Sequence, residues 1–355
     1  MNDIEMHDET NERKIEISSK KSVLPFVEKY RPTNVNEIIS HEEILSTISR
    51  FISQKSIPHF LFYGPPGTGK TTCALALARQ LYGDSYKNMI LELNASDDRG
   101  IQVVRNKIKD FCGALGSFSN MTINNNNGNF NMFKLVILDE ADMMTSDAQN
   151  ALRRIMEKYT KNSRFCLICN QVNKINMAIQ SRCMRFRFSP LKKEQCIMRL
   201  KNICMKENIN YTNDNTLIKI FEIAKGDMRK ILNLLEATFM ASSNSIIDEN
   251  SVYSCAGLPT PKQFKEFCNC CKGNDFGNIF HKLNDIRIQN GFAMVDLIEQ
   301  LTHFIRLNER ISENEKVEIF LLLGKMDFLC NIGGDEKIIL SNFISIIRKY
   351  KLNIV

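Results

Sequence analysis

The chain of 355 residues lacks any apolar run that approaches the roughly 18 residues a membrane-spanning helix needs. Its first 21 residues also lack an apolar segment, so we expect neither a membrane protein nor a secretory signal. A strong charge imbalance is missing as well, since 47 Lys and Arg residues stand against 40 Asp and Glu residues, a net charge of +7. What is present is an ordinary globular composition, with 43% hydrophobic residues and therefore enough apolar material for a large core.

A metal-binding pattern is also lacking among the 12 cysteines. Cys166 and Cys169 lie in the apolar run RFCLIC, which is expected to be a strand, and residues three apart in a strand point to opposite faces. The cluster at residues 268–271 has no partner pair at zinc-finger spacing. Because no secretory signal is seen, we expect free thiols rather than disulfides.

Short apolar runs alternate with helical patterns between residues 22 and 190. The runs HFLFY, MILEL, KLVILD and RFCLIC are each followed by a helical pattern. This alternation predicts an α/β domain with a parallel sheet flanked by helices. Residues 1–21 are expected to form a disordered tail, and the Asn-rich stretch at 120–131 a solvated surface insertion.

Strand signals stop after Pro190, and the rest of the chain has helical periodicity. The segment GLPTP at residues 257–261 is expected to separate two helical regions, because closely spaced prolines interrupt a helix. The predicted domains are therefore an α/β domain at 22–190, a helical domain at 191–257 and a second helical domain at 258–355.

The octapeptide GPPGTGKT at residues 64–71 fits the phosphate-loop pattern of two glycines, a lysine and a hydroxyl residue. An apolar run precedes it and a helical pattern follows, which is the context that the motif requires. Glycines let backbone N–H groups turn toward a phosphate, and the helix N-terminus adds partial positive charge. Lys70 is expected to neutralise the β- and γ-phosphates, and Thr71 to place its hydroxyl on Mg²⁺. The alternative is a Gly-rich turn without a chemical role.

A second motif, KLVILDE at residues 134–140, ends an apolar run with two acids. Asp139 is expected to hold a magnesium-bound water beside the phosphates, and Glu140 to polarise the attacking water. The alternative is a pair of solvated acids at a strand end. The next helix is expected from about Ser146, which fits a capping box with Gln149.

Asn170 follows the last apolar run, RFCLIC. An amide at the end of a strand can orient water or sense a γ-phosphate, but a lone Asn in this place is also common as a turn residue. The residue pattern alone leaves both alternatives open.

Basic residues concentrate in residues 173–201, where eight bases and one acid give an excess of +7. A second group follows the NASDD turn. Bases on one face would bind a phosphate backbone without reading sequence, although a charge run is often only a solvated face. No aromatic residues are interleaved for stacking on single strands, so a duplex backbone is the better candidate ligand. The two groups are Lys174, Arg182, Arg185, Arg187, Lys192, Lys193, Arg199 and Lys201, and Arg99, Arg105, Lys107 and Lys109.

Seven motifs together resemble the small subunits of replication factor C, which are clamp-loader ATPases of the AAA+ class. The resemblance covers about residues 23–355. Three further segments, EKYTKNSRFCLICN, VYSCAGLP and DEKIILSNFI, are most similar to the branch called subunit 3 in yeast and subunit 5 in animals. The seven motifs are VEKYRP, GPPGTGKTT, ELNASDDRGI, LDEAD, NALRRIMEKYT, SRC and GDMRK.

The resemblance implies an AAA+ P-loop NTPase domain, a helical lid at 191–257 and a C-terminal helical collar at 258–355. It also implies a heteropentamer that uses ATP and Mg²⁺ to load the sliding clamp PCNA onto primer-template DNA in the nucleus, without a membrane partner. The alternatives are a scaffold subunit that binds ATP without hydrolysing it, and a different AAA+ machine on DNA such as a helicase loader.

The resemblance also assigns residues to the ATP site. Val27, Arg31 and the backbone near Ile39 match the segment beside the adenine and ribose. Asn170 matches the first sensor of the γ-phosphate and Arg229 the second. The phosphate loop comprises Gly64, Pro65, Pro66, Gly67, Thr68, Gly69, Lys70, Thr71 and Thr72.

Further roles follow from the same resemblance. Asp139 matches the magnesium-binding acid and Glu140 the water-activating acid. Arg182, in the SRC motif, matches an arginine finger that acts on the ATP of a neighbouring subunit. The positions that match the family's contacts to the DNA backbone are Arg99, Arg105 and Lys174.

Overall fold

The computed structural model describes residues 24–54, 56–96, 102, 104–113, 133–242, 246–271, 273 and 275–350. The chain forms two compact units. The first comprises residues up to 210 together with 217–236, and the second comprises 211–216 together with the residues from 237 onward. The expected tail at 1–21 and the Asn-rich stretch at 120–131 lie outside the described residues.

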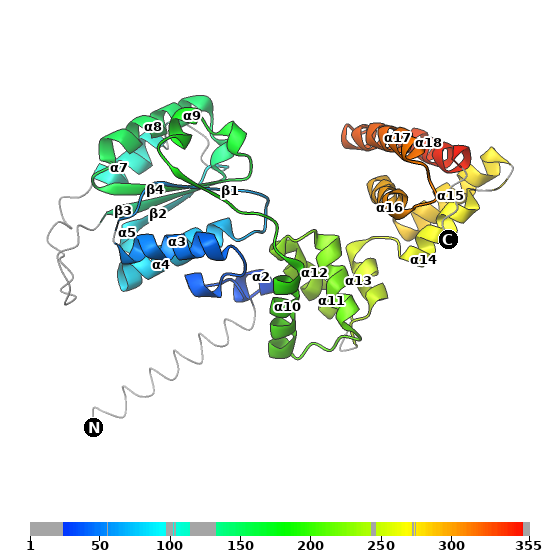
Figure 1. The fold of residues 1–355 in the computed structure, drawn as a ribbon, viewed down its shortest axis with the longest axis horizontal. Coiled ribbons are helices and arrows are strands. Elements are labelled where there is room, and N and C mark those ends of the chain that lie inside the picture. The colour runs from blue at the N-terminus through cyan, green and yellow to red at the C-terminus, as the bar shows by residue number, and fades with distance from the viewer. Residues whose placement is uncertain are drawn as a thin grey trace, which may run out of the picture. The chain divides into compact units, whose positions relative to one another are not determined.

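The first unit is built on a parallel sheet of five strands in the order β2-β3-β4-β1-β5 (Figure 1). The four apolar runs form β1 to β4, which confirms the predicted α/β fold. The edge strand β5 was not predicted, because three of its four side chains are exposed and two of them are arginines. The strands are β1 Phe60–Tyr63, β2 Ile90–Asn94, β3 Lys134–Asp139, β4 Ser163–Cys169 and β5 Met184–Arg187.

Helices cover both faces of this sheet (Figure 1). Because successive strand side chains point to opposite faces, Phe60 and Phe62 pack in one core and Leu61 in the other. One face carries α3 (Glu42–Ser53), α4 (Lys70–Tyr82) and α5 (Tyr86–Met89), and the other carries α7 (Lys109–Gly113), α8 (Ser146–Tyr159) and α9 (Met177–Gln180). Short segments complete the connections: α2 Phe26–Lys29, η1 Val35–Glu37, η2 Gly83–Ser85, η3 Val104–Ile108, η5 Ala141–Met143 and η6 Val172–Lys174.

The N-terminus of α8 differs from the expected capping box. Thr145 is the N-cap, and its hydroxyl accepts a backbone N–H of the first turn at 3.3 Å, so the prediction that Ser146 caps the helix is wrong. Gln149 is buried and serves another purpose. Its amide donates to the carbonyl of Lys174 at 3.0 Å and accepts from the N–H of Asn176 at 2.7 Å. Gln149 therefore ties α8 to the segment that precedes α9.

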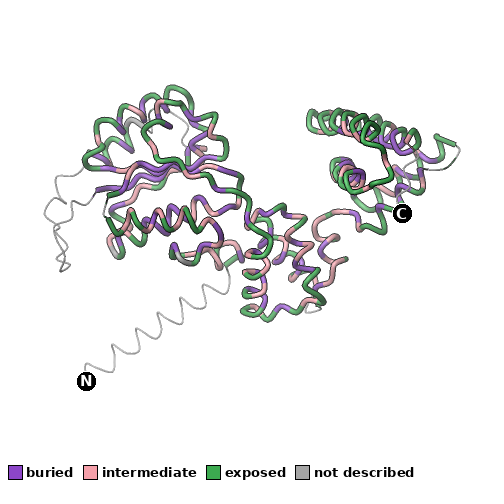
Figure 2. The backbone as a smooth tube through the Cα atoms, viewed as in Figure 1, coloured by how far each residue is buried: buried purple, intermediate pink, exposed green. Residues whose placement is uncertain are grey.

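Helices follow the sheet to the end of the described chain. The first of them are α10 (Lys193–Glu207), α11 (Asp214–Ala224) and α12 (Met228–Ala241). The second unit contains α13 (Glu249–Ala256), α14 (Pro261–Cys270), α15 (Phe276–Asn290), α16 (Met294–Leu307), α17 (Glu313–Asn331) and α18 (Glu336–Lys349). Apolar side chains such as Phe267, Leu301 and Phe343 form its core, and Figure 2 shows the buried positions along these helices.

The predicted break at 257–261 is a turn between two capped helices. Gly257 ends α13 in the left-handed region with a φ of 69°, which glycine adopts without steric cost. Pro261 is in the first turn of α14, where its missing N–H leaves no helical bond unmade. Thr260 and Gln263 form the capping box of this helix.

Candidate nucleotide site

The candidate site lies at the carboxyl edge of the sheet. Strands β3, β4 and β1 are neighbours, and parallel strands all end at the same edge. The phosphate loop follows β1, Asp139 ends β3 and Asn170 follows β4. The topology therefore brings together three motifs that are separated by up to about 100 residues in the sequence.

Two glycines allow the phosphate loop to pass close to other segments. Gly64 has a φ of 143°, and a Cβ at this position would lie 2.0 Å from the carbonyl oxygen of Phe188. Gly67 has a φ of 67°, and its Cβ would lie 1.6 Å from Oδ1 of Asp227. The N–H of Met228 donates to the carbonyl of Gly67 at 3.1 Å, so the start of α12 is bonded directly to the loop.

Lys70 is buried at the start of α4 and makes a full set of hydrogen bonds. Its ammonium group donates to the carbonyls of Gly64 and Pro65 at 2.7 Å each, and to Oδ1 of Asn170 at 3.0 Å. An ammonium has three donors, so each has a partner. Burial lowers the pKa of Lys70, and the nearby Asp139 carboxylate opposes this shift. The loop thus holds a cation directly beside Asn170.

Thr71 and the two acids form the adjacent part of the site. The hydroxyl of Thr71 donates to Oδ2 of Asp139 at 2.7 Å, and the N–H of Glu140 donates to Oδ1 of the same carboxylate at 2.8 Å. Glu140 has a φ of 51°, in the left-handed region that a non-glycine residue rarely adopts. Hydroxyl and carboxylate oxygens are the hard ligands that Mg²⁺ prefers, so this pair fits the ion.

A cavity joins these groups, and its lining includes most of the predicted ATP-site residues. Gly64 and Pro65 do not line it but accept the Lys70 hydrogen bonds. Arg182 does not line it either. The predicted residues that do are Val27, Arg31, Ile39, Pro66, Gly67, Thr68, Gly69, Lys70, Thr71, Thr72, Asp139, Glu140, Asn170 and Arg229.

The sequence patterns missed an apolar part of this cavity and one of its bases. Arg199 belongs to the basic stretch that was considered for nucleic acid, yet it lines the cavity and donates to the carbonyl of Tyr30 at 3.1 Å. No local signal distinguishes it from its neighbours, because its partner lies 169 residues away. The other lining residues outside the predicted set are Glu28, Tyr30, Pro32, Ile38, Leu191, Met228 and Leu232.

The N-terminal segment that forms one wall is anchored to α10 and α12. Lys29 forms an ion pair with Glu207 at 2.6 Å, and the hydroxyl of Tyr30 donates to the same carboxylate. Burial and the Glu207 carboxylate raise the pKa of Tyr30, which keeps this hydroxyl protonated. The N–H of Phe26 donates to Glu236 at 3.0 Å. Helix α2 is therefore held by acids from two later helices.

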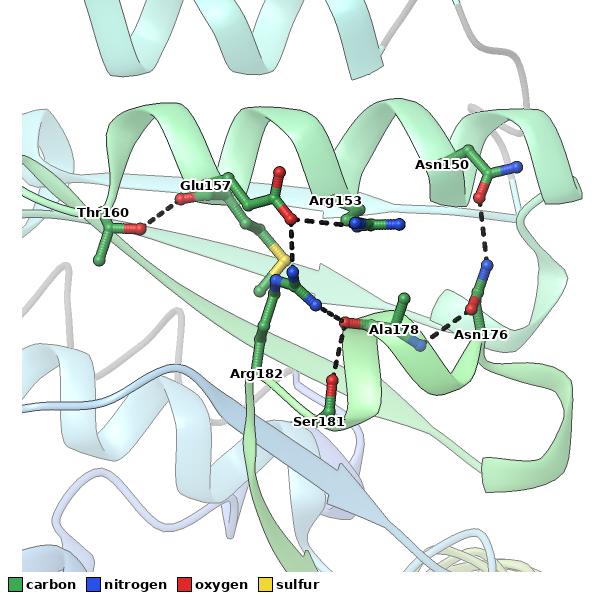
Figure 3. Close-up of polar contacts among 9 residues, drawn as sticks. Asn150, Arg153, Glu157, Thr160, Asn176, Ala178, Ser181 and Arg182 are labelled. Atoms are coloured by element: carbon green, nitrogen blue, oxygen red, sulfur yellow. Dashed lines mark hydrogen bonds and ion pairs between the residues drawn. The ribbon is translucent and has the colours of Figure 1, made fainter.

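Arg182 lies on the surface formed by α8 and α9 (Figure 3). It pairs with Glu157 at 2.6 Å, and a second nitrogen donates to the carbonyl of Ala178 at 2.7 Å. Its guanidinium group therefore contacts residues of α8 and α9 and does not line the cavity of its own chain.

The predicted DNA-contact residues are only partly described. Arg99 lies outside the described residues, and for Arg105 only the backbone, within η3, is described. Lys174 is exposed at the end of η6. The basic stretch at 173–201 does not form one face, since Arg182 pairs with Glu157 while Arg199 lines the cavity.

The sequence matches three protein families in order along the chain. Residues 60–191 match the ATPase family associated with various cellular activities (AAA), and residues 198–240 match the RCF1/5-like, AAA+ ATPase lid domain. Residues 259–345 match the replication factor C C-terminal domain. Together with the phosphate loop and the two acids, these matches define the class of the protein as an AAA+ ATPase, an enzyme that binds and hydrolyses ATP.

Similarity to whole proteins is more specific. The chain is 43% identical over 345 residues to probable replication factor C subunit 5 of Dictyostelium discoideum, covering 96% of both chains. It is 42% identical to subunit 3 of Saccharomyces cerevisiae, covering 90% of this chain and 91% of that one. It is 43% identical to subunit 5 of Homo sapiens, covering 91% of each. The chain belongs to the replication factor C subunit family. Within this family it belongs to the group that contains subunit 3 of Saccharomyces cerevisiae and subunit 5 of Homo sapiens.

A solved structure supports the fold alone. A point mutant of Thermotoga maritima RuvB aligns with a TM-score of 0.50 at 15% identity, covering 74% of this chain and 86% of that one. Of the helices that the structure describes, none has both the length and the apolar character needed to cross a membrane.

Proposed function

We propose that this chain is a subunit of the heteropentameric replication factor C complex, which loads the sliding clamp PCNA onto primed DNA in the nucleus. The observation that carries the proposal is the identity of 42–43% to replication factor C subunits over at least 90% of the chain. The site geometry supports an active subunit, because the loop lysine, both acids and the strand-end amide lie at one cavity.

In this proposal the chain's own residues carry out ATP hydrolysis. Lys70 neutralises the β- and γ-phosphates, since its ammonium can exchange loop carbonyls for phosphate oxygens. Glu140 polarises the attacking water as a general base. Asn170, which is bonded to Lys70, and Arg229, at the start of α12, contact the γ-phosphate and report whether ATP or ADP is bound.

Thr71 and Asp139 hold Mg²⁺ in this proposal. Their oxygens are 2.7 Å apart and have the hard character that the ion requires. A magnesium ion bound there would neutralise phosphate charge.

Assembly completes the site. Arg182 acts in trans on ATP bound by a neighbouring subunit, where a guanidinium neutralises the charge of the transition state. ATP at such interfaces favours the arrangement that holds the clamp open, and hydrolysis prompted by DNA releases it, as a shift between two populations. Arg99, Arg105 and Lys174 contact the DNA backbone without reading the base sequence.

The domain assignment follows from the same proposal. Residues 22–190 form the ATPase domain, 191–257 the lid and 258–355 the collar that assembles the ring. An exposed apolar stripe on α17 supports the last assignment, because side chains spaced by four and seven residues share one face of a helix. The stripe comprises Val317, Leu321, Phe328 and, at the end of the helix, Ile332, which are 58–64% exposed.

The substitution Glu140→Gln in this chain alone tests the proposal. We expect ATP turnover at this site, measured in the co-expressed complex with clamp and primed DNA, to fall about a hundredfold or more, because the general base is lost. Nucleotide binding should be retained. Asp147→Asn, which removes an exposed acid in the first turn of α8, is the matched control.

Two results would contradict the proposal in different ways. Unchanged turnover with retained binding would mean that ATP at this site is structural, as in a scaffold subunit. A wild-type chain that forms no complex and shows no stimulation by clamp and DNA would contradict the clamp-loading function itself.

A further inference from the structure

The guanidinium group of Arg182 is fixed at its tip by two acceptors of its own subunit (Figure 3). Nη2 lies 2.6 Å from Oε1 of Glu157, and Nη1 donates to the carbonyl of Ala178 at 2.7 Å. The same Oε1 atom accepts a hydrogen bond from Nε of Arg153 at 3.0 Å. One carboxylate oxygen therefore contacts two guanidinium groups. Its negative charge offsets the repulsion between their positive charges.

The backbone beneath Arg182 does not depend on this carboxylate. The buried Gln149 side chain fixes the segment before α9 through hydrogen bonds to the backbone of Lys174 and Asn176. The side chain of Asn176 adds a hydrogen bond to Asn150 of α8 at 3.1 Å (Figure 3). Amide hydrogen bonds thus hold α9 against α8, and the contact of Glu157 with Arg182 is at the end of the arginine side chain.

The ion pair contributes little to the stability of the fold, because both partners are partly exposed, at 35% for Arg182 and 42% for Glu157. Its effect is on orientation. A free arginine side chain has many rotamers, and fixing its planar group in advance removes part of the entropy that binding would otherwise cost.

A guanidinium group has five N–H donors in one plane. Glu157 engages it through a single oxygen at Nη2, and Ala178 through Nη1. The group therefore retains donor capacity for a phosphate oxygen while the bond to Glu157 persists. This geometry therefore orients the guanidinium group for a further ligand and does not use up its donors within the subunit.

We propose that Glu157 is a positioning residue that presents the Arg182 guanidinium to ATP bound by a neighbouring subunit. The inference rests on the proposed function, in which Arg182 acts in trans.

The test uses Glu157→Gln, which is nearly isosteric, and Glu157→Ala in the assembled complex. We expect the kcat for turnover at the neighbouring site to fall about three- to tenfold while KM for ATP stays nearly unchanged, because the group acts in the transition state. In the Arg182→Ala background, Glu157→Ala should lower turnover no further, since a residue that acts through another is not additive with it. Glu222→Gln, an exposed acid paired with Lys193 and Lys219, is the matched control.

The outcomes separate this inference from the proposed function. If Arg182→Ala leaves turnover at the neighbouring site intact, the trans role of Arg182 is wrong, and the inference falls with it. If Arg182→Ala lowers turnover but the Glu157 variants leave it unchanged or raise it, the trans role stands and the positioning role is overturned. A Glu157 effect that persists undiminished in the Arg182→Ala background also overturns the positioning role.

Discussion

At the scale of single residues, His59 is a buried imidazole that is neutral in the folded chain at neutral pH. Its Nδ1 accepts the backbone N–H of Phe165 at 3.2 Å, which ties the start of β1 to β4. Burial, assisted by the nearby Arg164 guanidinium, lowers the pKa of His59 from 6.5 to about 4. The neutral form is therefore the one that the fold accommodates.

This shift predicts a loss of stability in mild acid. Since the folded chain binds the His59 proton less readily than the unfolded chain, the free energy of unfolding falls as pH drops from about 6.5 toward 4, by up to about 3 kcal/mol. Denaturant unfolding at several pH values measures it. In His59→Asn, whose amide oxygen can replace Nδ1 as acceptor, this component of the pH dependence should disappear. An identical pH profile in the two proteins would show that His59 is not responsible.

Residues of the phosphate site were predictable where one short motif carries the chemistry. Lys70 and Thr71 could be assigned because they hold fixed places in the phosphate-loop motif at the start of α4, and Asp139 because it ends the apolar strand β3. Arg199 and Tyr30 could not be assigned in the same way, because their contact joins positions 169 residues apart and depends on how α10 packs.

At the scale of elements, helix α2 forms part of one wall of the cavity. It is only four residues long, and an isolated helix of this length is unstable in water. Its position depends instead on Glu207 from α10 and Glu236 from α12. The acids are therefore expected to influence nucleotide binding although neither lines the cavity.

The variant Glu207→Gln tests this dependence. Loss of the charged pair with Lys29 should raise KM for ATP about two- to fivefold with little change in kcat, since a partly exposed ion pair contributes up to about 1 kcal/mol. Steady-state ATPase measurements on the assembled complex separate the two constants. Glu194→Gln, at the first turn of the same helix, is the control. A fall in kcat with unchanged KM would argue against an anchoring role.

Elements with a strong apolar pattern were predictable and those without one were not. Strands β1, β3 and β4 are mostly buried apolar runs because helices cover both faces of the sheet, and the edge strand β2 was predicted from Ile90, Leu91 and Leu93 although Glu92 is exposed. Strand β5 lies at an edge and has only Phe186 packed against the core, so its alternation with exposed bases resembled a charge run. The N-cap of α8 is Thr145, one residue before the predicted Ser146. The sequence does not separate the two because both are residue types that favour this position.

At the scale of the whole molecule, the second unit exposes more apolar surface than its own packing requires. The side chains of Leu321 and Phe328 are 64% and 62% exposed on one face of α17, although the same helix buries Ile319 and Leu323. A helix that is apolar on both sides is expected to be covered on both sides.

We therefore predict that Leu321→Glu with Phe328→Glu weakens assembly without unfolding the chain. Both positions are already exposed, so the thermal midpoint of the isolated variant should remain within a few degrees of wild type. Co-purification of the other subunits should fall about tenfold or more. Gln289→Glu, which adds a charge at an exposed polar position of α15, is the control. Full assembly of the double variant would exclude this stripe as an interface.

The hydrogen bonds of Lys70 have a consequence for the interval between two rounds of ATP use. A buried ammonium that lost its phosphate partners without replacement would destabilise the protein by several kcal/mol. Here the carbonyls of Gly64 and Pro65 and the amide oxygen of Asn170 accept from all three donors. Because Lys70 binds phosphate in the proposed function, we expect these acceptors to keep the loop folded when product leaves, so that nucleotide exchange needs no local unfolding.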